Sequence, residues 1–441
     1  MERTLVKDIR SQIGKEVTVK GFVQVIRDQK AVQFLILRDH TGMVQVVVER
    51  TEPNAQFNQI LASLARESAV EVSGKVVDNP RVKLGQVEIQ LSDLIIDSNS
   101  EAVLPVDISG QTLTEIDKRL DWRFLDLRRP ENQLIFRIQT TVEQAMREFW
   151  VAEGFVEIHT PKLMGSASEG GAELFTLPYF GQTAALAQSP QFFKQMAMAA
   201  GLDRVFEIGP VFRADPSFTS RHATEFTSVD MEMSWIDSHA DVMELEERWL
   251  RHILEQVQEK HGTEIKSFYD TEVVIPEIPF PKFSMAEAQE ILRREGHTPP
   301  ADTRTGDIDP QGERVLCEYV QRELRHEFVF ITDYPKDIRP FYHMRYADQP
   351  GITKSFDLLW KWMEITTGSQ REHRYDVLES QAREMGVRLE AIQFYLDFFR
   401  FGCPPHGGFG FGLARLLAAL VNQGNIREVT FLHRGPNRLV P

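Results

Sequence analysis

The segment VFRADPSFTSRHATEFTSVDMEMSW, residues 211–235, alternates apolar and polar residues at both ends and crowds charge into its middle. Alternation with a period of two predicts two strands joined by a loop. The titratable residues of this segment are Arg213, Asp215, Arg221, His222, Glu225, Asp230 and Glu232. Charge at this density is costly to bury without compensating partners. A hydrophobic core alone does not account for this hairpin.

The length and composition indicate a globular protein of two or three domains, with 441 residues, 42% hydrophobic and 26% charged. The two cysteines, Cys317 and Cys403, lie far apart and have no CxxC partner. This argues against a zinc finger or a disulfide framework and favours a reducing compartment. The sequence begins without an apolar leader and holds no run long enough to cross a bilayer. We therefore expect a cytoplasmic protein with no membrane partner.

The net charge of −15 at first argues against a nucleic-acid partner. Acidic and basic residues balance within residues 1–100, however, so the acidic excess lies in the remainder of the chain. Because whole-chain charge says more about solubility than about one binding face, it neither establishes nor excludes a polyanionic ligand.

The first hundred residues predict an all-β module. Strand-like runs cover residues 17–25, 32–37, 43–48, 69–76 and 86–91. Residues 53–68, between the third and fourth runs, have apolar residues at helical spacing. Five short strands with a helix after the third fit an OB-fold, a barrel that often binds single-stranded nucleic acid or oligosaccharide. On composition alone, an unspecified β-barrel fits nearly as well.

The rest of the chain predicts a hinge and a larger domain. The expected division is a barrel over 1–100, a proline-containing, charged hinge over 101–130, and a second domain over 131–441. Amphipathic helices are expected at 131–150, ended by Gly154, and at 239–260. Strands and helices follow without βαβ regularity, so we expect an α+β domain built on an antiparallel sheet with flanking helices.

A glycine-rich segment, GGFGFGLARL at residues 407–416, leads into a predicted helix. Its spacing matches neither a Walker A loop nor a dinucleotide-binding fingerprint, and both motifs are absent from the chain. Close packing of a strand explains the glycines well. It explains Arg415 less well, because a guanidinium inside a packed interface needs an anionic partner.

Two carboxylates, Asp357 and Glu364, lie seven residues apart within KSFDLLWKWMEITTGSQREH, residues 354–373. With a hydroxyl from the nearby Thr366 or Thr367 they could hold Mg²⁺ and bridge it to phosphates. For an isolated acidic pair, a solvated surface is the better interpretation. The apolar neighbours of this pair favour burial, which would require a cation.

Lys194 lies in an apolar run, beside Phe192 and Phe193 in LAQSPQFFKQ, residues 186–195. An isolated lysine is usually a solvated charge. In these surroundings a carboxylate ligand becomes plausible.

Taken together, these segments resemble the class II aminoacyl-tRNA synthetases, and within them the aspartyl enzymes of the archaeal-like branch. FWVAEGFVEIHTPKL resembles motif 1, which ends at Pro161, while VFRADPSFTSRHATEFTSVDME resembles motif 2 and GGFGFGLARL motif 3. ASEGGAELF, QSPQFFKQ and EITTGSQR are similar to the segments that hold the amino acid in this family, and the last 17 residues are similar to its tail. The likeness covers the whole chain, and the class I signatures HIGH and KMSKS are absent.

The resemblance implies ATP-dependent attachment of L-aspartate to tRNA-Asp, with Mg²⁺ as cofactor and a homodimer formed through motif 1. Such chemistry needs positioning and charge neutralisation rather than a nucleophilic side chain. Arg213 and Arg415 would be catalytic, on opposite sides of the triphosphate. The implied ATP contacts are Arg213, Asp215, Arg221, His222, Phe226, Glu364 and Arg415. The implied Mg²⁺ ligands are Asp357, Glu364 and Thr367.

The same resemblance implies the aspartate site. Its residues would be Glu169, Gln191, Lys194, Arg213, Ser228, Asp230, Thr367, Gly368 and Arg371. Arg371 and Lys194 would read the side-chain carboxylate, which a guanidinium with an ammonium recognises well. Asparaginyl enzymes lack this lysine, so Lys194 favours aspartate. Lysyl enzymes would need an acidic pocket in place of Arg371.

Three positions depart from the family pattern. Asp215 stands where glutamate is usual, Ala414 where an acid is common, and Ser369 where glycine or alanine is common. None of these departures removes a charge-neutralising group, so we expect an active enzyme.

The barrel would read the anticodon. Phe34 could stack on a base while Arg27 and Gln45 bond its edge or phosphate. Without the resemblance, these residues would be interpreted as a core aromatic and two surface polar groups. Relatives that charge both tRNA-Asp and tRNA-Asn tend to carry His and Pro where this chain has Gln24 and Lys83, which favours an enzyme specific for tRNA-Asp.

Four alternatives remain open from the sequence. They are an enzyme that charges both tRNA-Asp and tRNA-Asn, an asparaginyl enzyme, a tRNA-independent asparagine synthetase, and an RNA-binding paralogue without aminoacylation activity. Lys194 disfavours the second and the barrel disfavours the third. The presence of Arg213, Arg415, Asp357 and Glu364 disfavours the fourth.

Overall fold

The computed structural model describes residues 2–110, 112, 114–165 and 174–441. The chain divides into two compact units, Met1–Pro105 and Val106–Pro441. Each unit has its own hydrophobic core.

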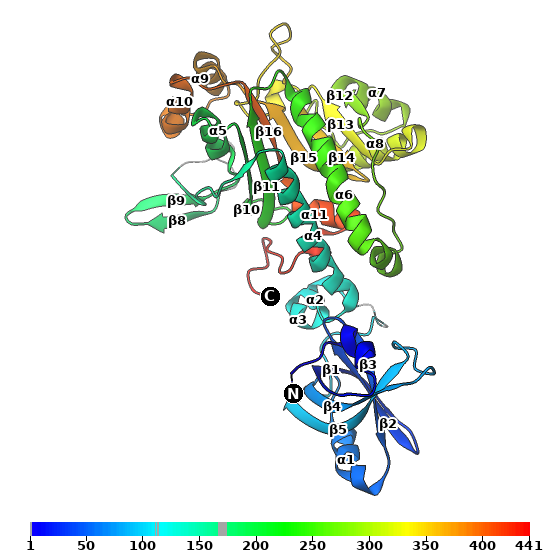
Figure 1. Ribbon diagram of the computed structural model, residues 1–441. Coiled ribbons are helices and arrows are strands. Elements are labelled where there is room, and N and C mark those ends of the chain that lie inside the picture. Colours follow the sequence, from blue (N-terminus) through cyan, green and yellow to red (C-terminus); the bar gives the residue numbers. More distant parts are fainter. Residues whose placement is uncertain (1, 111, 113, 166–173) are drawn as a thin grey trace. The chain divides into compact units, whose positions relative to one another are not determined.

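The first unit is a closed barrel with the strand order β1-β2-β3-β5-β4 (Figure 1). The strands are β1 (Glu16–Asp28), β2 (Val32–Asp39), β3 (Gly42–Glu49), β4 (Ala69–Asp78) and β5 (Val87–Ser98). The helix α1 (Ala55–Ser63) follows β3, and among the pairings of these five strands β3–β5 is parallel and the others are antiparallel. Five strands with a helix after the third give the predicted OB-fold.

The second unit is built on an eight-stranded sheet with the order β12-β13-β14-β15-β16-β11-β10-β6. Its strands are β6 (Val156–Glu157), β10 (Arg204–Phe212), β11 (Glu225–Ser234), β12 (Lys282–Ser284), β13 (Phe328–Thr332), β14 (Ser355–Trp360), β15 (Met363–Gln370) and β16 (His406–Gly412). The inner six strands are antiparallel, as predicted, whereas the edge strands β6 and β12 pair in parallel. A separate small sheet contains β7 (Leu163–Met164), β8 (Thr176–Tyr179) and β9 (Gln182–Leu186).

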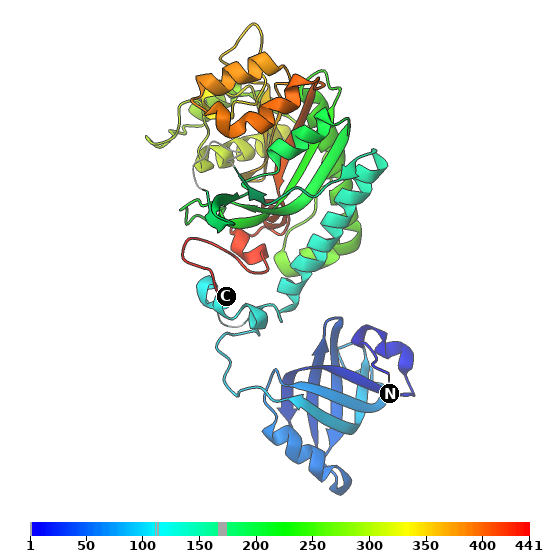
Figure 2. The same ribbon diagram turned by 90° about the vertical axis from the view of Figure 1, so that its left-hand side faces the viewer.

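Two long helices, α4 (Pro130–Ala152) and α6 (His239–Tyr269), lie alongside each other on the sheet (Figures 1 and 2). Pro130 begins α4 where its missing N–H costs nothing, and Ser238 caps α6 in a capping box with Asp241. The ring centroids of Trp150 and Trp249 lie 4.7 Å apart where the helices meet. The helix α6 is nine residues longer than the sequence predicted, because its amphipathic face continues to Ile265.

The remaining helices frame the sheet. They are α2 (Ile116–Asp121), α3 (Arg123–Asp126), α5 (Gln191–Ala199), α7 (Met285–Arg294), α8 (Pro310–Leu324), α9 (Tyr375–Glu384), α10 (Gln393–Arg400), α11 (Leu413–Leu420) and α12 (Ile426–Val429). Short 3-10 helices cover Val6–Gln12, Glu52–Asn54, Lys336–Ile338 and Leu389–Ile392. Helices α5, α9 and α10 gather at one end of the sheet (Figure 1).

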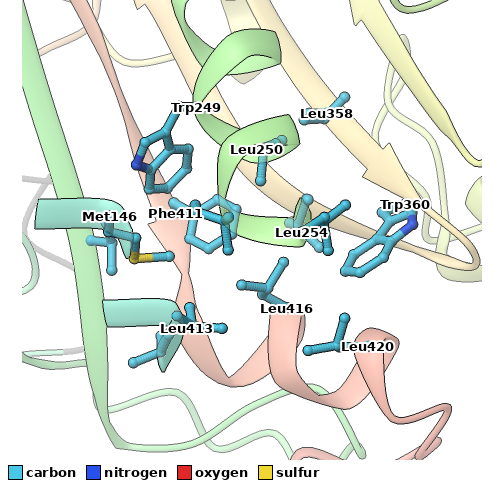
Figure 3. Close-up of a cluster of buried hydrophobic side chains, with 14 of the residues drawn as sticks. Met146, Trp249, Leu250, Leu254, Leu358, Trp360, Phe411, Leu413, Leu416 and Leu420 are labelled. Atoms are coloured by element: carbon cyan, nitrogen blue, oxygen red, sulfur yellow. The ribbon is translucent and has the colours of Figure 1, made fainter. Parts of the chain in front are cut away.

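The core of this unit joins α4, α6, the sheet and α11. Figure 3 shows side chains from these elements pointing toward one another: Met146, Trp249, Leu250, Leu254, Leu358, Trp360, Phe411, Leu413, Leu416 and Leu420. All ten are buried. This packing fixes the strands that carry the charged residues discussed below.

Residues 115–129, part of the expected hinge, contain α2 and α3 and contact the C-terminal segment. A buried ion pair joins Arg123 to Asp126 at 2.6 Å, and Arg119 contacts Glu428 at 2.8 Å. These contacts hold α2 and α3 within the second unit. None of the helices in the described part of the chain is both long enough and apolar enough to span a bilayer.

The glycines of β16 are required by close strand packing. A Cβ at position 408 would lie 2.1 Å from the carbonyl oxygen of Met231, on the neighbouring strand β11. No nearby backbone can move without breaking strand pairing.

We expect Gly408→Ala to lower the free energy of unfolding by at least about 2 kcal/mol, because the added methyl overlaps backbone. Urea denaturation measures this change. The control is Gly424→Ala, whose added Cβ meets no atom within 4 Å. Equal stability of the two variants would contradict this account of the glycine run.

A buried carboxyl on α6 makes stability depend on pH. Both oxygens of Glu246 are buried without a hydrogen-bond partner among the described residues. Burial raises the pKa of Glu246 from 4.5 to about 8. Between these values the unfolded chain releases the proton while the folded chain keeps it, so stability must fall as pH rises.

We therefore expect Glu246→Gln to flatten the decline in unfolding free energy between pH 5 and pH 7, by up to about 1.4 kcal/mol per pH unit. Urea denaturation of the wild-type protein and the variant at several pH values provides the comparison. Identical slopes would show that this carboxyl does not carry the effect.

Candidate active site

A cavity of about 500 Å³ opens in the second unit. Of the residues selected from the sequence, it is lined by Gln191, Lys194, Arg213, Asp215, Arg221, His222, Phe226, Ser228, Asp230, Glu364, Thr367, Arg371 and Arg415. They come from α5, the β10–β11 hairpin, β15 and the residue that follows it, and the start of α11. Segments more than 200 residues apart in the sequence thus meet around one space.

The β10–β11 hairpin carries the charged residues of the opening segment. Its strands pair up to Phe212 and Glu225, and the Arg213 N–H closes the loop by donating to the Thr224 carbonyl at 2.9 Å. The Asp215 carboxylate accepts from the Ser217 N–H at 2.9 Å, which stabilises the turn. The Arg213 guanidinium lies 5.5 Å from the centre of the Phe226 ring.

Arg221 is held by a carboxylate that the sequence did not reveal. Its Nη1 donates to Glu313 Oε2 at 2.5 Å, and its Nη2 donates to the Trp362 carbonyl at 2.7 Å. Glu313, on α8, also accepts from the Glu364 N–H at 3.1 Å. Burial raises the pKa of Glu313 to about 7. Glu313 therefore links the hairpin loop to β15.

His222 lies beside these cations. Its Nδ1 is 3.1 Å from the Ser217 hydroxyl, and its Nε2 is 3.9 Å from Asp215 Oδ2. Burial, together with the positive charge of Arg415, lowers the pKa of His222. An anionic ligand in the cavity would act in the opposite direction.

Arg415 and Glu364 form the opposite side of the cavity. Arg415 Nη1 donates to the backbone carbonyl of Glu364 at 2.8 Å and to its Oε1 at 3.2 Å. The Thr367 hydroxyl donates to the same Oε1 at 3.1 Å. Burial raises the pKa of Glu364, and Arg415 opposes that effect.

Asp357, the other predicted Mg²⁺ ligand, is not among the residues that line the cavity, and Arg339 lies against it. Arg339 Nη2 donates to Asp357 Oδ2 at 2.6 Å, and Arg339 itself lines the cavity. Asp357 Oδ1 is buried and has no hydrogen-bond partner in the described part of the chain. An unpaired carboxylate oxygen, next to Thr367 across the β14–β15 pairing, fits a Mg²⁺ ligand.

The described residues contain no group of three or more His, Cys, Asp or Glu side chains arranged to hold a metal. Two carboxylates and a hydroxyl are suited to Mg²⁺, which keeps several water or phosphate ligands. The residues present therefore fit an ion that arrives with a phosphate-bearing substrate.

The other end of the cavity contains a buried network of charges. Lys194 Nζ donates to Asp230 Oδ1 at 3.0 Å and to the Phe409 carbonyl at 3.1 Å, and it lies 3.4 Å from Glu232 Oε2. The Ser228 hydroxyl donates to Asp230 Oδ2 at 2.5 Å. Ser228, Asp230 and Glu232 lie on one face of β11 because every second residue of a strand points the same way.

Arg371 completes this network. Its Nε donates to Glu232 Oε1 at 3.0 Å and its Nη1 donates to the Ser369 hydroxyl at 2.7 Å. Burial alone would raise the pKa of Glu232, but the positive charges of Arg371 and Lys194 hold it below the usual value. The Ser369 departure noted in the sequence therefore adds a hydrogen bond to Arg371.

One described residue predicted for the aspartate site is not among those that line the cavity. Gly368 is absent from its lining, because the position faces the Phe356 ring on the opposite side of β15, where a Cβ would come within 2.3 Å of that ring. Glu169 lies outside the described residues. Ala414, the third departure from the family pattern, does line the cavity.

The sequence did not identify several charged or polar residues of this site, four of which make or accept the contacts described above or line the cavity. These four are Glu232, Glu313, Arg339 and His343. For Glu232 a signal was available, because Ser228, Asp230 and Glu232 alternate along one strand. Glu313, Arg339 and His343 come from distant segments without a distinctive pattern.

In the barrel, Arg27, Phe34 and Gln45 lie on adjacent strands, away from the core residues Leu35 and Leu37. Phe34 is partly exposed and pairs directly with Arg27. Gln45 donates to Glu88 Oε2 at 2.9 Å.

The two barrel positions associated with tRNA choice differ in their surroundings. Gln24 accepts a hydrogen bond from Arg38, which itself pairs with the buried Glu67 at 2.8 Å. Lys83 is exposed on the loop between β4 and β5.

Comparison with protein families agrees with this architecture. Residues 115–434 match the model for tRNA synthetases class II (D, K and N), and residues 17–97 match that of the OB-fold nucleic acid binding domain. These matches confirm the family resemblance and the two-part fold.

Similar proteins include ligases of two named specificities. The chain is 44% identical over 428 residues to the aspartate–tRNA(Asp) ligase of Pyrococcus abyssi, which covers 97% of both chains. It is 40% identical over 442 residues to the aspartate–tRNA(Asp/Asn) ligase of Archaeoglobus fulgidus, which covers 100% of both.

Similar solved structures show the same fold over the whole chain. The asparaginyl-tRNA synthetase of Pyrococcus horikoshii with asparaginyl-adenylate superposes with a TM-score of 0.92 at 32% identity and covers 100% of both chains. The aspartyl-tRNA synthetase of Entamoeba histolytica gives a TM-score of 0.87 at 32% identity and covers 100% of this chain and 93% of that one.

Proposed function

Because the chain belongs to the class II tRNA synthetases of the D, K and N group, we propose that it joins L-aspartate to tRNA-Asp at the expense of ATP. The observation that carries the amino-acid assignment is the buried pair of cations, Lys194 and Arg371, at one end of the cavity. A carboxylate side chain is the natural ligand for an ammonium and a guanidinium placed side by side.

The proposed reaction has two steps. The α-carboxylate of aspartate attacks the α-phosphorus of ATP, the bond to the β-phosphate bridging oxygen breaks, and pyrophosphate leaves. A hydroxyl at the tRNA 3′ end then attacks the carbonyl carbon, loses its proton to solvent or to phosphate, and releases AMP. The first step requires alignment of two anions, which Arg213 supports between the hairpin and the amino-acid end.

At the end of the cavity away from Lys194 and Arg371, which we call the phosphate end, Arg221, His222 and Arg415 would bind the phosphates of ATP. In the structure, Arg221 and Arg415 are paired with Glu313 and Glu364. If phosphate oxygens replaced these carboxylates when ATP binds, the positive charge of each guanidinium would have an anionic partner both before and after binding. Phe226 would stack on the adenine, and Asp215 would contact its edge.

Mg²⁺ would be held by Asp357, Glu364 and Thr367. Bound there, the ion would neutralise charge on the transferring phosphates. The orphan oxygen of Asp357 and the raised pKa of Glu364 both support a cation at this place.

At the amino-acid end, Lys194 and Arg371 would read the side chain, while Asp230 and Gln191 would receive the substrate ammonium. Ser228 would act by orienting Asp230, to which its hydroxyl donates. Thr367 and Arg213 would border the reacting carboxylate. By the family resemblance, Glu169 would also contact the aspartate.

The barrel would bind the anticodon of tRNA-Asp through Phe34, Arg27 and Gln45. Phe34 is partly exposed beside an arginine, which suits stacking on a base. Gln24 and Lys83 favour tRNA-Asp over tRNA-Asn. Relatives of both specificities match this chain, so tRNA-Asn is the second candidate substrate.

We also propose a homodimer in which α4 and β6 meet a second copy. Val151, Val156 and Leu163, around these elements, are 65%, 48% and 47% exposed, which is costly in a monomer.

The free thiols of Cys317 and Cys403 support a cytoplasmic location.

We expect labelled aspartate to be attached to transcribed tRNA-Asp and not to tRNA-Asn. The reason is the presence of Gln24 and Lys83 in the anticodon-binding barrel. Aminoacylation of the two transcripts, assayed separately, gives the answer. Charging of both would overturn the tRNA discrimination, and charging of neither would overturn the proposed function.

We expect Lys194→Met to reduce aspartate-dependent pyrophosphate exchange by about 100-fold or more, because a charged hydrogen bond to the substrate is lost. ATP binding, measured by equilibrium dialysis, should persist. The matched control Lys266→Met changes an exposed lysine of α6. Exchange at the wild-type level in Lys194→Met would remove the specificity assignment.

A further inference from the structure

Arg371 has no N–H left for a substrate in the free protein. Nε donates to Glu232 Oε1 at 3.0 Å, and Nη2 reaches the Gly408 carbonyl at 2.9 Å and Glu232 Oε2 at 3.4 Å. Nη1 donates to the Ser369 hydroxyl at 2.7 Å and to His343 Nε2 at 3.2 Å. A guanidinium has five N–H groups, so all of them are engaged. A substrate carboxylate must displace one of these acceptors.

Only one of those acceptors lies at the cavity. Arg371 and His343 both line it, whereas Glu232, Gly408 and Ser369 do not. The His343 contact is also 0.5 Å longer than the Ser369 contact on the same nitrogen. A carboxylate that approaches from the cavity therefore meets Nη1 at its bond to His343.

Nε2 of His343 can change from hydrogen-bond acceptor to donor without breaking a hydrogen bond at Nδ1. A guanidinium only donates, so Nε2 is the acceptor and the ring proton lies on Nδ1. Nδ1 is buried and has no partner in the described part of the chain. Moving the proton from Nδ1 to Nε2 therefore breaks no existing bond at Nδ1.

The surroundings keep this ring neutral. Burial lowers the pKa of His343 well below its usual value, and the charges of Arg371, Arg339 and Lys194 act in the same direction. Backbone pairing fixes its place, since His343 and Arg371 form a β-bridge and the Met344 N–H donates to the Gln370 carbonyl at 3.0 Å.

We propose that His343 is a specificity-determining residue for the amino-acid side chain, an inference that rests on the proposed function. In the free protein it accepts a hydrogen bond from Arg371. When the substrate carboxylate takes that N–H, the ring changes to the tautomer with its proton on Nε2 and none on Nδ1, and Nε2 donates to the carboxylate. The ring stays neutral, and Ser369 retains the other Nη1 proton so that Arg371 does not rotate.

Two substitutions separate this role from simple packing. His343→Leu removes both donor and acceptor, while His343→Gln keeps an amide that can present either group. In aspartate-dependent pyrophosphate exchange, we expect His343→Leu to raise KM for aspartate by about 10- to 100-fold, with KM for ATP unchanged. We expect His343→Gln to stay within about threefold of wild type. His40→Leu, in an exposed turn of the barrel, is the matched control.

An unchanged KM for aspartate in His343→Leu would overturn the inference, and so would equal rises in both KM values or a His343→Gln variant as impaired as His343→Leu. Nitrogen-15 chemical shifts of His343 provide a measurement that does not depend on a variant folding. The proton should lie on Nδ1 without aspartate and on Nε2 with it, and no change would also overturn the inference. Failure of the wild-type protein to activate aspartate would instead contradict the proposed function itself.

Discussion

The site depends on mutual compensation of buried charges. Four charged side chains of this site are each at most 5% exposed: Lys194, Asp230, Glu232 and Arg371. Lys194 forms ion pairs with Asp230 and Glu232, and Arg371 forms one with Glu232. A buried ion loses several kcal/mol of hydration, so removing one member would leave its neighbour uncompensated. Such a network is a weak source of stability compared with apolar packing. Its value here is a rigid arrangement of cations that faces a cavity.

The fold supplies that rigidity. The strands β11, β15 and β16 are neighbours in the centre of the sheet, and the α4–α6 layer packs against it (Figures 1 and 3). Because Gly408 has no Cβ, β16 can lie close to β11. The backbone carbonyl of Gly408 accepts a hydrogen bond from Arg371. Arg221 and Arg415, which also line the cavity, are likewise held by carboxylates, those of Glu313 and Glu364. Both ends of the cavity thus keep their cations in place with internal anions.

The sequence predicted those parts that local patterns govern. Period-two and helical spacing predicted the barrel strands, the β10–β11 hairpin and the long helices, and the family resemblance named thirteen of the residues that line the cavity. Contacts between distant segments could not be predicted. Nothing local marks Glu313 as the partner of Arg221, or His343 as the partner of Arg371. Arg339, which lies against Asp357, is likewise visible only once β14 and residues 336–343 are folded together.

The most direct test of the account is a crystal structure of the protein with a non-hydrolysable aspartyl-adenylate analogue. The account predicts the side-chain carboxylate within hydrogen-bond distance of Lys194 Nζ and Arg371 Nη1, with the adenine on Phe226. Arg213 should then contact the oxygens that stand in for the α-phosphate. A side-chain carboxylate located elsewhere, with Lys194 and Arg371 still bonded only to protein groups, would contradict it.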